Sequence, residues 1–191
     1  EDVRLLAGVL GKKEGSLSWL DGTGLNYGMI TARVVEIPGD DFPEDSRGFS
    51  MFDVMFVNGY DCRMLNDSQK EAVLEWVKNG GTLLVDTGRD RDLTLDILGE
   101  AGGEVTLKDP EVRWVGMGTE YTKNRPGDSE VRVTYTEPVI SGAEERMVAD
   151  GTPLLKTLQY GKGTIGVYGV SLSDLSGFAK KNPAFAPYFL G

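Results

Sequence analysis

The 191-residue sequence contains no histidine and a single cysteine, Cys62. Without histidine the chain cannot form a Ser-His-Asp or Cys-His catalytic site, a usual zinc site, or the usual general base at neutral pH. One cysteine excludes an internal disulfide framework and any metal site made of several cysteines. An enzyme built from this chain would therefore depend on carboxylate acid–base chemistry, a Ser-Lys pair or a metal held by oxygen ligands.

The sequence also lacks an apolar run near the roughly 20 residues that a membrane helix needs, and it has no signal-peptide pattern. It begins at Glu1 rather than at methionine, so we expect a piece of a longer protein from which a flanking membrane anchor has been removed. The net charge of −10 argues against nucleic acid and anionic membranes as partners, because Lys and Arg provide most of that affinity. The length suits one domain over residues 1–191.

What the sequence does contain is a segment that predicts a βαβ unit. Phe52–Val57 and Thr82–Val85 are short apolar runs, typical of strands covered on both faces. Between them, Asn66 and Gln69 match a capping box at the start of an amphipathic helix, and Gly80 provides its end. This order predicts an α/β fold with a mostly parallel central sheet and helices on both faces.

Further strands are predicted on both sides of this unit. Val3–Leu10 and Ile30–Ile37 are expected to form the first two strands of the sheet, and Leu154–Tyr160 and Thr164–Val170 a hairpin whose second strand rejoins it. Residues 104–150 hold short runs with strand propensity between turn signals, which predicts a β-rich extension within the domain. At most a short helix is expected around Ser16–Leu20. Asp92–Leu98 is expected to be the start of another helix, and Ser171–Lys181 a closing helix capped by Ser173 or Ser176.

Polar residues follow the predicted third and fourth strands, at the edge where open α/β sheets gather their ligands. The candidate ligand-binding residues are Asn58, Asp61, Asp86, Thr87, Arg89 and Asp90. One interpretation is a carboxylate cluster that binds a cation or a polar ligand. The alternative is that Asp86 and Thr87 satisfy backbone amides of a tight turn while Asp90 is solvated. Cys62 lies beside the charge of Asp61 and is expected to be unreactive.

Other patterns in the sequence only partly match known binding loops. Gly22–Gly28 has one residue too many for a dinucleotide-binding loop, and Gly161–Thr164 lacks the earlier glycine of a phosphate-binding loop, so we expect a mobile loop and a hairpin turn. A second acidic group does not have the spacing of a calcium-binding loop and is expected to be a charged linker. That group comprises Glu36, Asp40, Asp41, Glu44 and Asp45. We assign no cofactor and no metal site.

One motif resembles a known family. The stretch L-(S/N)-x-x-Q…W-V-x-x-G-G-x-L is matched by Leu65, Asn66, Gln69, Trp76, Val77, Gly80, Gly81 and Leu83. It resembles the class I glutamine amidotransferase-like, flavodoxin-like fold, in the histidine-poor versions found in bacterial membrane-anchored proteins of unknown function. Residues 153–175 are similar to the closing strand and helix of those proteins. In true amidotransferases a cysteine follows the strand matched by Leu83–Val85, whereas here Asp86 follows it, so glutaminase chemistry is not carried over.

These observations predict a non-catalytic ligand- or protein-binding module. The resemblance implies a place on the extracytoplasmic face of a bacterial membrane, with an unknown protein or small molecule bound at the loops after the strands. The alternative is a carboxylate- or metal-dependent hydrolase that uses Asp86 and Asp61, with Asn58 or Arg89 orienting the substrate. A third possibility is a structural role in a larger assembly.

Overall fold

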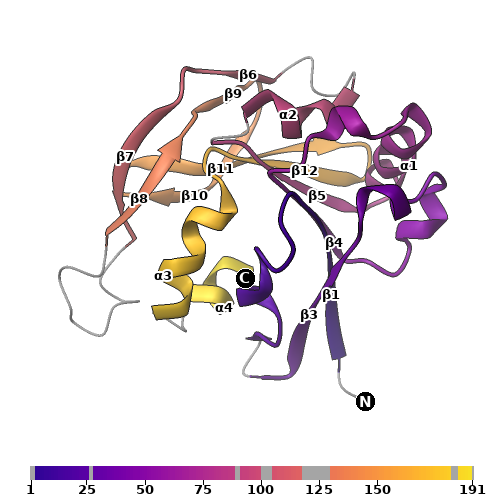
Figure 1. Ribbon diagram of the computed structural model, residues 1–191, viewed down its shortest axis with the longest axis horizontal. Coiled ribbons are helices and arrows are strands. Elements are labelled where there is room, and N and C mark those ends of the chain that lie inside the picture. Colours follow the sequence, from indigo (N-terminus) through magenta and orange to yellow (C-terminus); the bar gives the residue numbers. More distant parts are fainter. Residues whose placement is uncertain are drawn as a thin grey trace.

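A computed structural model describes residues 3–25, 28–88, 91–99, 105–117, 130–181 and 185–190. Its centre is an eight-stranded sheet with the strand order β10-β11-β12-β5-β4-β1-β3-β2 (Figure 1). The strands of this sheet are β1 (Val3–Gly11), β2 (Gly24–Leu25), β3 (Ile30–Glu36), β4 (Val54–Asn58), β5 (Thr82–Asp86), β10 (Glu144–Ala149), β11 (Thr152–Tyr160) and β12 (Gly163–Tyr168).

The five central strands, β3, β1, β4, β5 and β12, are parallel, and β2, β10 and β11 join the two sides antiparallel. The prediction of a mostly parallel sheet is therefore confirmed. The chain passes from β1 to β3 on one side and then to β4 on the other, so the order of strands reverses between β1 and β4. A crevice at such a reversal is where open α/β sheets place their ligands.

The predicted βαβ unit is present as β4, α1 (Asp67–Lys78) and β5. Its helix begins with the expected capping box, because the backbone N–H of Gln69 donates to Asn66 Oδ1 at 2.8 Å and the N–H of Asn66 donates to Gln69 Oε1 at 2.9 Å. The apolar side of α1 is buried against the sheet through Trp76 and its neighbours. Gly80 follows the helix with a positive φ of 120°, a conformation that favours glycine.

Two apolar clusters lie on opposite faces of the sheet. Helix α1 and α2 (Arg91–Leu95) lie on one face, and α3 (Ser176–Lys181) and α4 (Phe185–Leu190) on the other (Figure 1). Among the described residues, the connections from β1 to β3 and from β3 to β4 contain 3-10 turns and the short strand β2 but no α-helix. Their sequences are rich in glycine, aspartate and proline, which disfavour α-helix. The fold is therefore mixed α/β with few helices, and not a clear flavodoxin-like fold.

The strands predicted between residues 104 and 150 are observed as β6 (Val105–Leu107), β7 (Glu111–Gly116) and β8 (Glu130–Tyr135). Strand β6 pairs with β9 (Pro138–Ile140), and β7 pairs with β8, so this region forms two small two-stranded sheets. Strand β10 instead extends the central sheet, with an irregular register around Met147. The sequence analysis predicts neither β9 nor β10.

The helix expected over Ser171–Lys181 is divided. Leu172–Leu175 forms a 3-10 turn, for which the flanking Ser171 provides no side-chain cap, and the α-helical part begins only at Ser176. The helix expected over Ser16–Leu20 is likewise a 3-10 turn at Ser18–Leu20, and α2 is shorter than expected. Among the residues with described structure, no helix has the length and apolar character that crossing a membrane requires.

Candidate functional site

A cavity of about 220 Å³ lies at the carboxyl edge of the sheet, at the strand-order reversal between β1 and β4. The register aligns Gly11 with Asn58 and Asp86 with Tyr168, so the residues that follow β1, β4, β5 and β12 reach the same edge. The cavity is lined by Lys12, Lys13, Ser16, Asn58, Gly59, Ser171 and Ser173. Three separate segments of the chain therefore form its wall.

Asn58 has a fixed orientation in this wall. Its side-chain Oδ1 accepts a hydrogen bond from Ser16 Oγ at 2.6 Å, and its Nδ2 donates to Asp86 Oδ2. Its backbone carbonyl accepts from the N–H of Lys12 at 2.9 Å. These contacts tie the loop after β1 to the end of β4, so the cavity wall is pre-organised.

Asp86 lies fully buried beside this cavity. Its two carboxylate oxygens accept hydrogen bonds from the backbone N–H of Gly59 (2.9 Å), the backbone N–H of Leu172 (2.9 Å) and the side-chain amide of Asn58. The amides that it satisfies belong to the segments after β4 and β12 rather than to its own turn. Burial, followed by the nearby charge of Asp86, raises the pKa of Tyr168. Asp86 thus joins three strand ends.

Thr87 and Gly88 continue from Asp86 into a tightly packed turn. The backbone N–H and the hydroxyl of Thr87 both donate to the carbonyl of Tyr168, at 3.1 and 2.7 Å. Gly88 has a φ of 68°, and a Cβ at this position would lie 2.6 Å from Ser171 N and 2.8 Å from Thr134 O. The turn therefore joins β5 to the segment after β12. Arg89 and Asp90, the remaining candidates from this loop, lie outside the described residues.

Asp61 is engaged by its neighbour. Its carboxylate accepts two hydrogen bonds of 2.8 Å from the Arg63 guanidinium, and these contacts lower the pKa of Asp61. Cys62 is completely buried, and burial, with a further contribution from the charge of Asp96, raises the pKa of its thiol to about 12. The low reactivity expected for Cys62 therefore has burial as its main cause, and Asp61 contributes little.

The members of the second acidic group have different partners. Asp45 pairs with Arg47, which lowers the pKa of Asp45 to about 2, and Glu44 accepts a hydrogen bond of 2.8 Å from Asn66 Nδ2. Glu36 accepts from the backbone N–H of Gly15. Among the residues that can be placed, no group of three or more Cys, Asp or Glu side chains is arranged to hold a metal ion.

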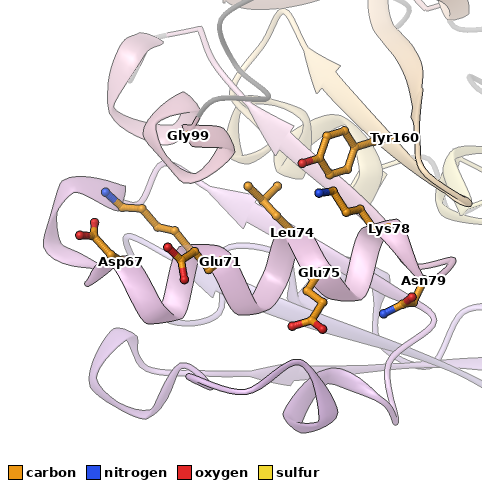
Figure 2. A pocket seen from close by; sticks show the side chains of 9 residues that line it. Asp67, Glu71, Leu74, Glu75, Lys78, Asn79, Gly99 and Tyr160 are labelled. Atoms are coloured by element: carbon orange, nitrogen blue, oxygen red, sulfur yellow. The ribbon is translucent and has the colours of Figure 1, made fainter.

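A larger groove, of about 800 Å³, runs along the outer side of α1. Figure 2 shows its lining side chains, which are Asp67, Lys70, Glu71, Leu74, Glu75, Lys78 and Asn79, with Gly99 and Tyr160 opposite. The two lysines have partners within the protein: Lys70 pairs with Asp96 at 2.6 Å and Lys78 lies 5.4 Å from the ring centroid of Tyr160. Because this groove mixes both signs of charge and lies away from the carboxyl ends of the parallel strands, the smaller cavity is the better candidate site.

Of the residues predicted as a site, the structure brings Asn58 to the cavity wall and Asp86 beside it, while Thr87 and Asp61 make other contacts. The sequence analysis missed the basic and hydroxyl residues after β1 and after β12, namely Lys12, Lys13, Ser16, Ser171 and Ser173. For Lys12 and Lys13 the sequence contains a signal, because both directly follow the first predicted strand and therefore reach the same edge of the sheet.

No protein-family model matches this chain, and comparison with curated proteins gives no match. Solved structures do match in fold. Cytoplasmic protein STM1381 from Salmonella typhimurium LT2 has a TM-score of 0.60 at 16% identity, over 93% of this chain and 96% of that one. The exo-β-1,4-mannosidase Op5Man5 from Opitutaceae bacterium strain TAV5 has a TM-score of 0.60 at 12% identity, over 98% of this chain and 36% of that one.

A third similar structure is the E323A catalytic mutant of Gan42B, a GH42 β-galactosidase from G. stearothermophilus. Its TM-score is 0.54 at 14% identity, over 97% of this chain and 28% of that one. The chain thus spans nearly all of STM1381 but only about a third of each of these two glycoside hydrolases. At these identities the likeness shows a shared fold and gives no information about activity. The description of STM1381 as cytoplasmic gives no support to the extracytoplasmic location expected from the sequence.

Proposed function

We propose that this chain is a non-catalytic binding module that holds a small polar ligand in the cavity between the ends of β1 and β4. The observation that carries this proposal is the coincidence of a preformed polar cavity with the strand-order reversal of the sheet. The fixed orientation of Asn58 supports it further, because a binding site needs polar groups whose directions are set before the ligand arrives.

The hydrolase is the second candidate, and the contacts of its two carboxylates make it the weaker one. Asp86 has no exposed surface, and its oxygens accept hydrogen bonds from Gly59, Leu172 and Asn58. Asp61 pairs with Arg63 and does not line the cavity. A general acid or base must reach the proton that it transfers, and neither carboxylate is presented to the cavity in this way.

The amidotransferase-like ancestry and the bacterial membrane-associated setting also remain part of this proposal. They rest on the motif around Leu65 and Trp76. The buried Asp86 and the closely packed Gly88 at the turn after β5 support a scaffold without a nucleophile there. We infer no glycoside hydrolase activity from the fold likeness, since this chain corresponds to a minor part of those enzymes.

The proposal is tested by filling the cavity. Small polar compounds are screened by the amide chemical shifts of the ¹⁵N-labelled protein, with Ser16, Asn58 and Gly59 as reporters. We expect a ligand to move these signals, and Ser173→Trp, which replaces an exposed hydroxyl of the wall, to abolish its binding. Ser68→Trp, at an exposed site on α1, is the matched control and should leave binding unchanged.

Two outcomes would contradict the proposal. One is a ligand whose shifts map elsewhere and survive Ser173→Trp. The other is turnover of nitrophenyl esters, phosphates or glycosides that Ser173→Trp removes and Ser68→Trp does not, which would favour the hydrolase instead.

A further inference from the structure

We infer that the ligand of this cavity carries a compact oxyanion, a carboxylate or a phosphate group. This inference rests on the proposed function and specifies the ligand class. It follows from three properties of the wall, which are its charge, its hydrogen-bonding groups and its size.

The charge of the wall is opposite to that of the chain. The whole sequence has 30 acidic and 20 basic residues, yet the lining includes Lys12 and Lys13 and, among the described residues, no carboxylate. The nearest buried carboxylate, Asp86, does not line the cavity, and its oxygens accept three hydrogen bonds from within the protein. A cleft with one sign of charge raises the local concentration of the opposite sign, so this wall favours anions in a protein that otherwise repels them.

The hydrogen-bonding groups of the wall also favour an acceptor-rich ligand. Each lysine ammonium is a compact charge with three donors. The hydroxyls of Ser171 and Ser173 lie 2.7 Å apart, so one donates to the other and the second keeps its proton for another acceptor. One of the two amide N–H groups of Asn58 donates to Asp86 and is therefore not available to a ligand. The side-chain groups of the wall that can donate to a ligand therefore include Lys13 and the serine pair.

The size of the cavity restricts the group that enters it. At about 220 Å³ it is smaller than the roughly 300 to 1,000 Å³ of pockets that enclose drug-sized ligands. A phosphate, or a carboxylate with a short carbon chain, fits this space. A larger ligand would place its anionic group here and extend into solvent.

The test compares anionic and neutral probes by the same amide shifts. Inorganic phosphate and malonate represent the two sources of oxyanion, and glucose is the neutral probe. We expect phosphate, malonate or both to bind, and to bind several-fold more weakly when NaCl is raised from 50 to 300 mM, because salt screens partly exposed charges. Lys12→Ala/Lys13→Ala should weaken binding at least tenfold. Lys162→Ala/Lys180→Ala, which removes two exposed lysines outside the lining, should not.

The outcomes separate this inference from the proposal on which it rests. Binding of glucose in the cavity, lost in Ser173→Trp, with no response to either anion would overturn the oxyanion inference and leave the binding module in place. Anion binding that survives the double lysine substitution would also overturn it. If no probe or screened compound moves the cavity signals, the proposed function itself fails. A response to phosphate alone or to malonate alone identifies which oxyanion the site selects.

Discussion

At the scale of single residues, Asp86 links more segments at the carboxyl edge of the sheet than the other candidate residues predicted from the sequence. It accepts hydrogen bonds from segments after β4 and β12, and its own carbonyl accepts from Thr94 Oγ1 in α2. The cavity wall depends on it indirectly, because it holds Asn58 and Gly59 in position. A change at Asp86 should therefore affect stability first and binding as a consequence.

Asp86→Asn should lower the free energy of unfolding by about 2 kcal/mol, because the new amide nitrogen leaves a buried donor without an acceptor. In a domain of this size that corresponds to a fall of roughly 4 to 8 °C in melting temperature. Calorimetry measures it. Asp61→Asn is the control and should cause a smaller decrease, since Asp61 pairs with Arg63 at the surface. Equal decreases in both variants would contradict the role given to Asp86.

Cys62 should be unreactive in the folded protein. Its raised pKa of about 12 leaves the thiol almost fully protonated at pH 8, and the thiolate is the reactive form. A thiol-disulfide reagent at pH 8 should label it only after denaturant is added. Because the folded pKa lies above the unfolded one, this group's contribution to stability is fully present below about pH 9 and is lost as the pH rises toward 12. Rapid labelling without denaturant would contradict this.

At this scale the sequence predicts the sheet edge at which the candidate cavity lies, but only some of the residues that line it. Asn58 and Asp86 are predicted because they follow buried strands. Which groups a carboxylate contacts depends on residues distant in sequence, such as Leu172, 86 positions after Asp86. That contact is set by the packing of the whole sheet and has no local signal. Lys12 and Lys13 do have a local signal, because they directly follow the first predicted strand.

At the scale of elements, α1 was predicted within a residue because its capping box and apolar face are both local patterns. The strands on either side of it are also predicted correctly, with ends that differ from the structure by at most two residues. Strand β9 and the helix α4 were missed, since they are short and become stable only through packing. The 3-10 turn at Leu172–Leu175 replaced a predicted helix where Asp86 binds the N–H of Leu172.

The capping box of α1 has an additional role that predicts unequal effects of two substitutions. Gln69 Nε2 donates to the carbonyls of Gly39 and Phe42, both at 3.0 Å, besides completing the cap. Asn66→Ala should cost about 1 kcal/mol of unfolding free energy, and Gln69→Ala about 2 to 3 kcal/mol, because two further hydrogen bonds are lost. Glu71→Ala on the same helix should change it by less than about 0.5 kcal/mol. Urea titrations measure all three, and equal costs at Asn66 and Gln69 would refute this account.

The contact between β12 and the end of α1 leaves no space for a side chain at Gly163. A Cβ there would collide with the carbonyl oxygens of Val77 and Gly81. Gly163→Ala should therefore destabilise the protein by about 3 kcal/mol. A Cβ at Gly177, in α3, would have no atom of the described residues within 4 Å, and Gly177→Ala should be neutral or stabilising by up to about 1 kcal/mol. Thermal unfolding of the two variants measures both effects. An unchanged melting temperature in Gly163→Ala would contradict the close packing.

At the scale of the whole molecule, the sheet has a protected centre and less protected margins. All five residues of β4 are buried, and β4 is hydrogen-bonded to β1 and β5 on its two sides. The β7–β8 pair forms a separate two-stranded sheet with exposed residues such as Val112 and Trp114. Amide hydrogen exchange should therefore be slowest in β4 and β5 and faster in β7 by orders of magnitude. Similar rates in β4 and β7 would indicate a different distribution of stability.

The two edge strands of the central sheet affect whether one molecule can associate with another through its backbone. An open sheet with long, regular outer strands invites another chain to add a strand, which leads to aggregation. Here one outer strand, β2, has two residues within the part of the chain that is described, and the other, β10, has an irregular register near Met147 and the exposed charges of Glu144 and Glu145. Neither border offers a straight, uncharged row of backbone donors and acceptors. The central sheet can therefore keep its two edges open without serving as a template for fibril formation.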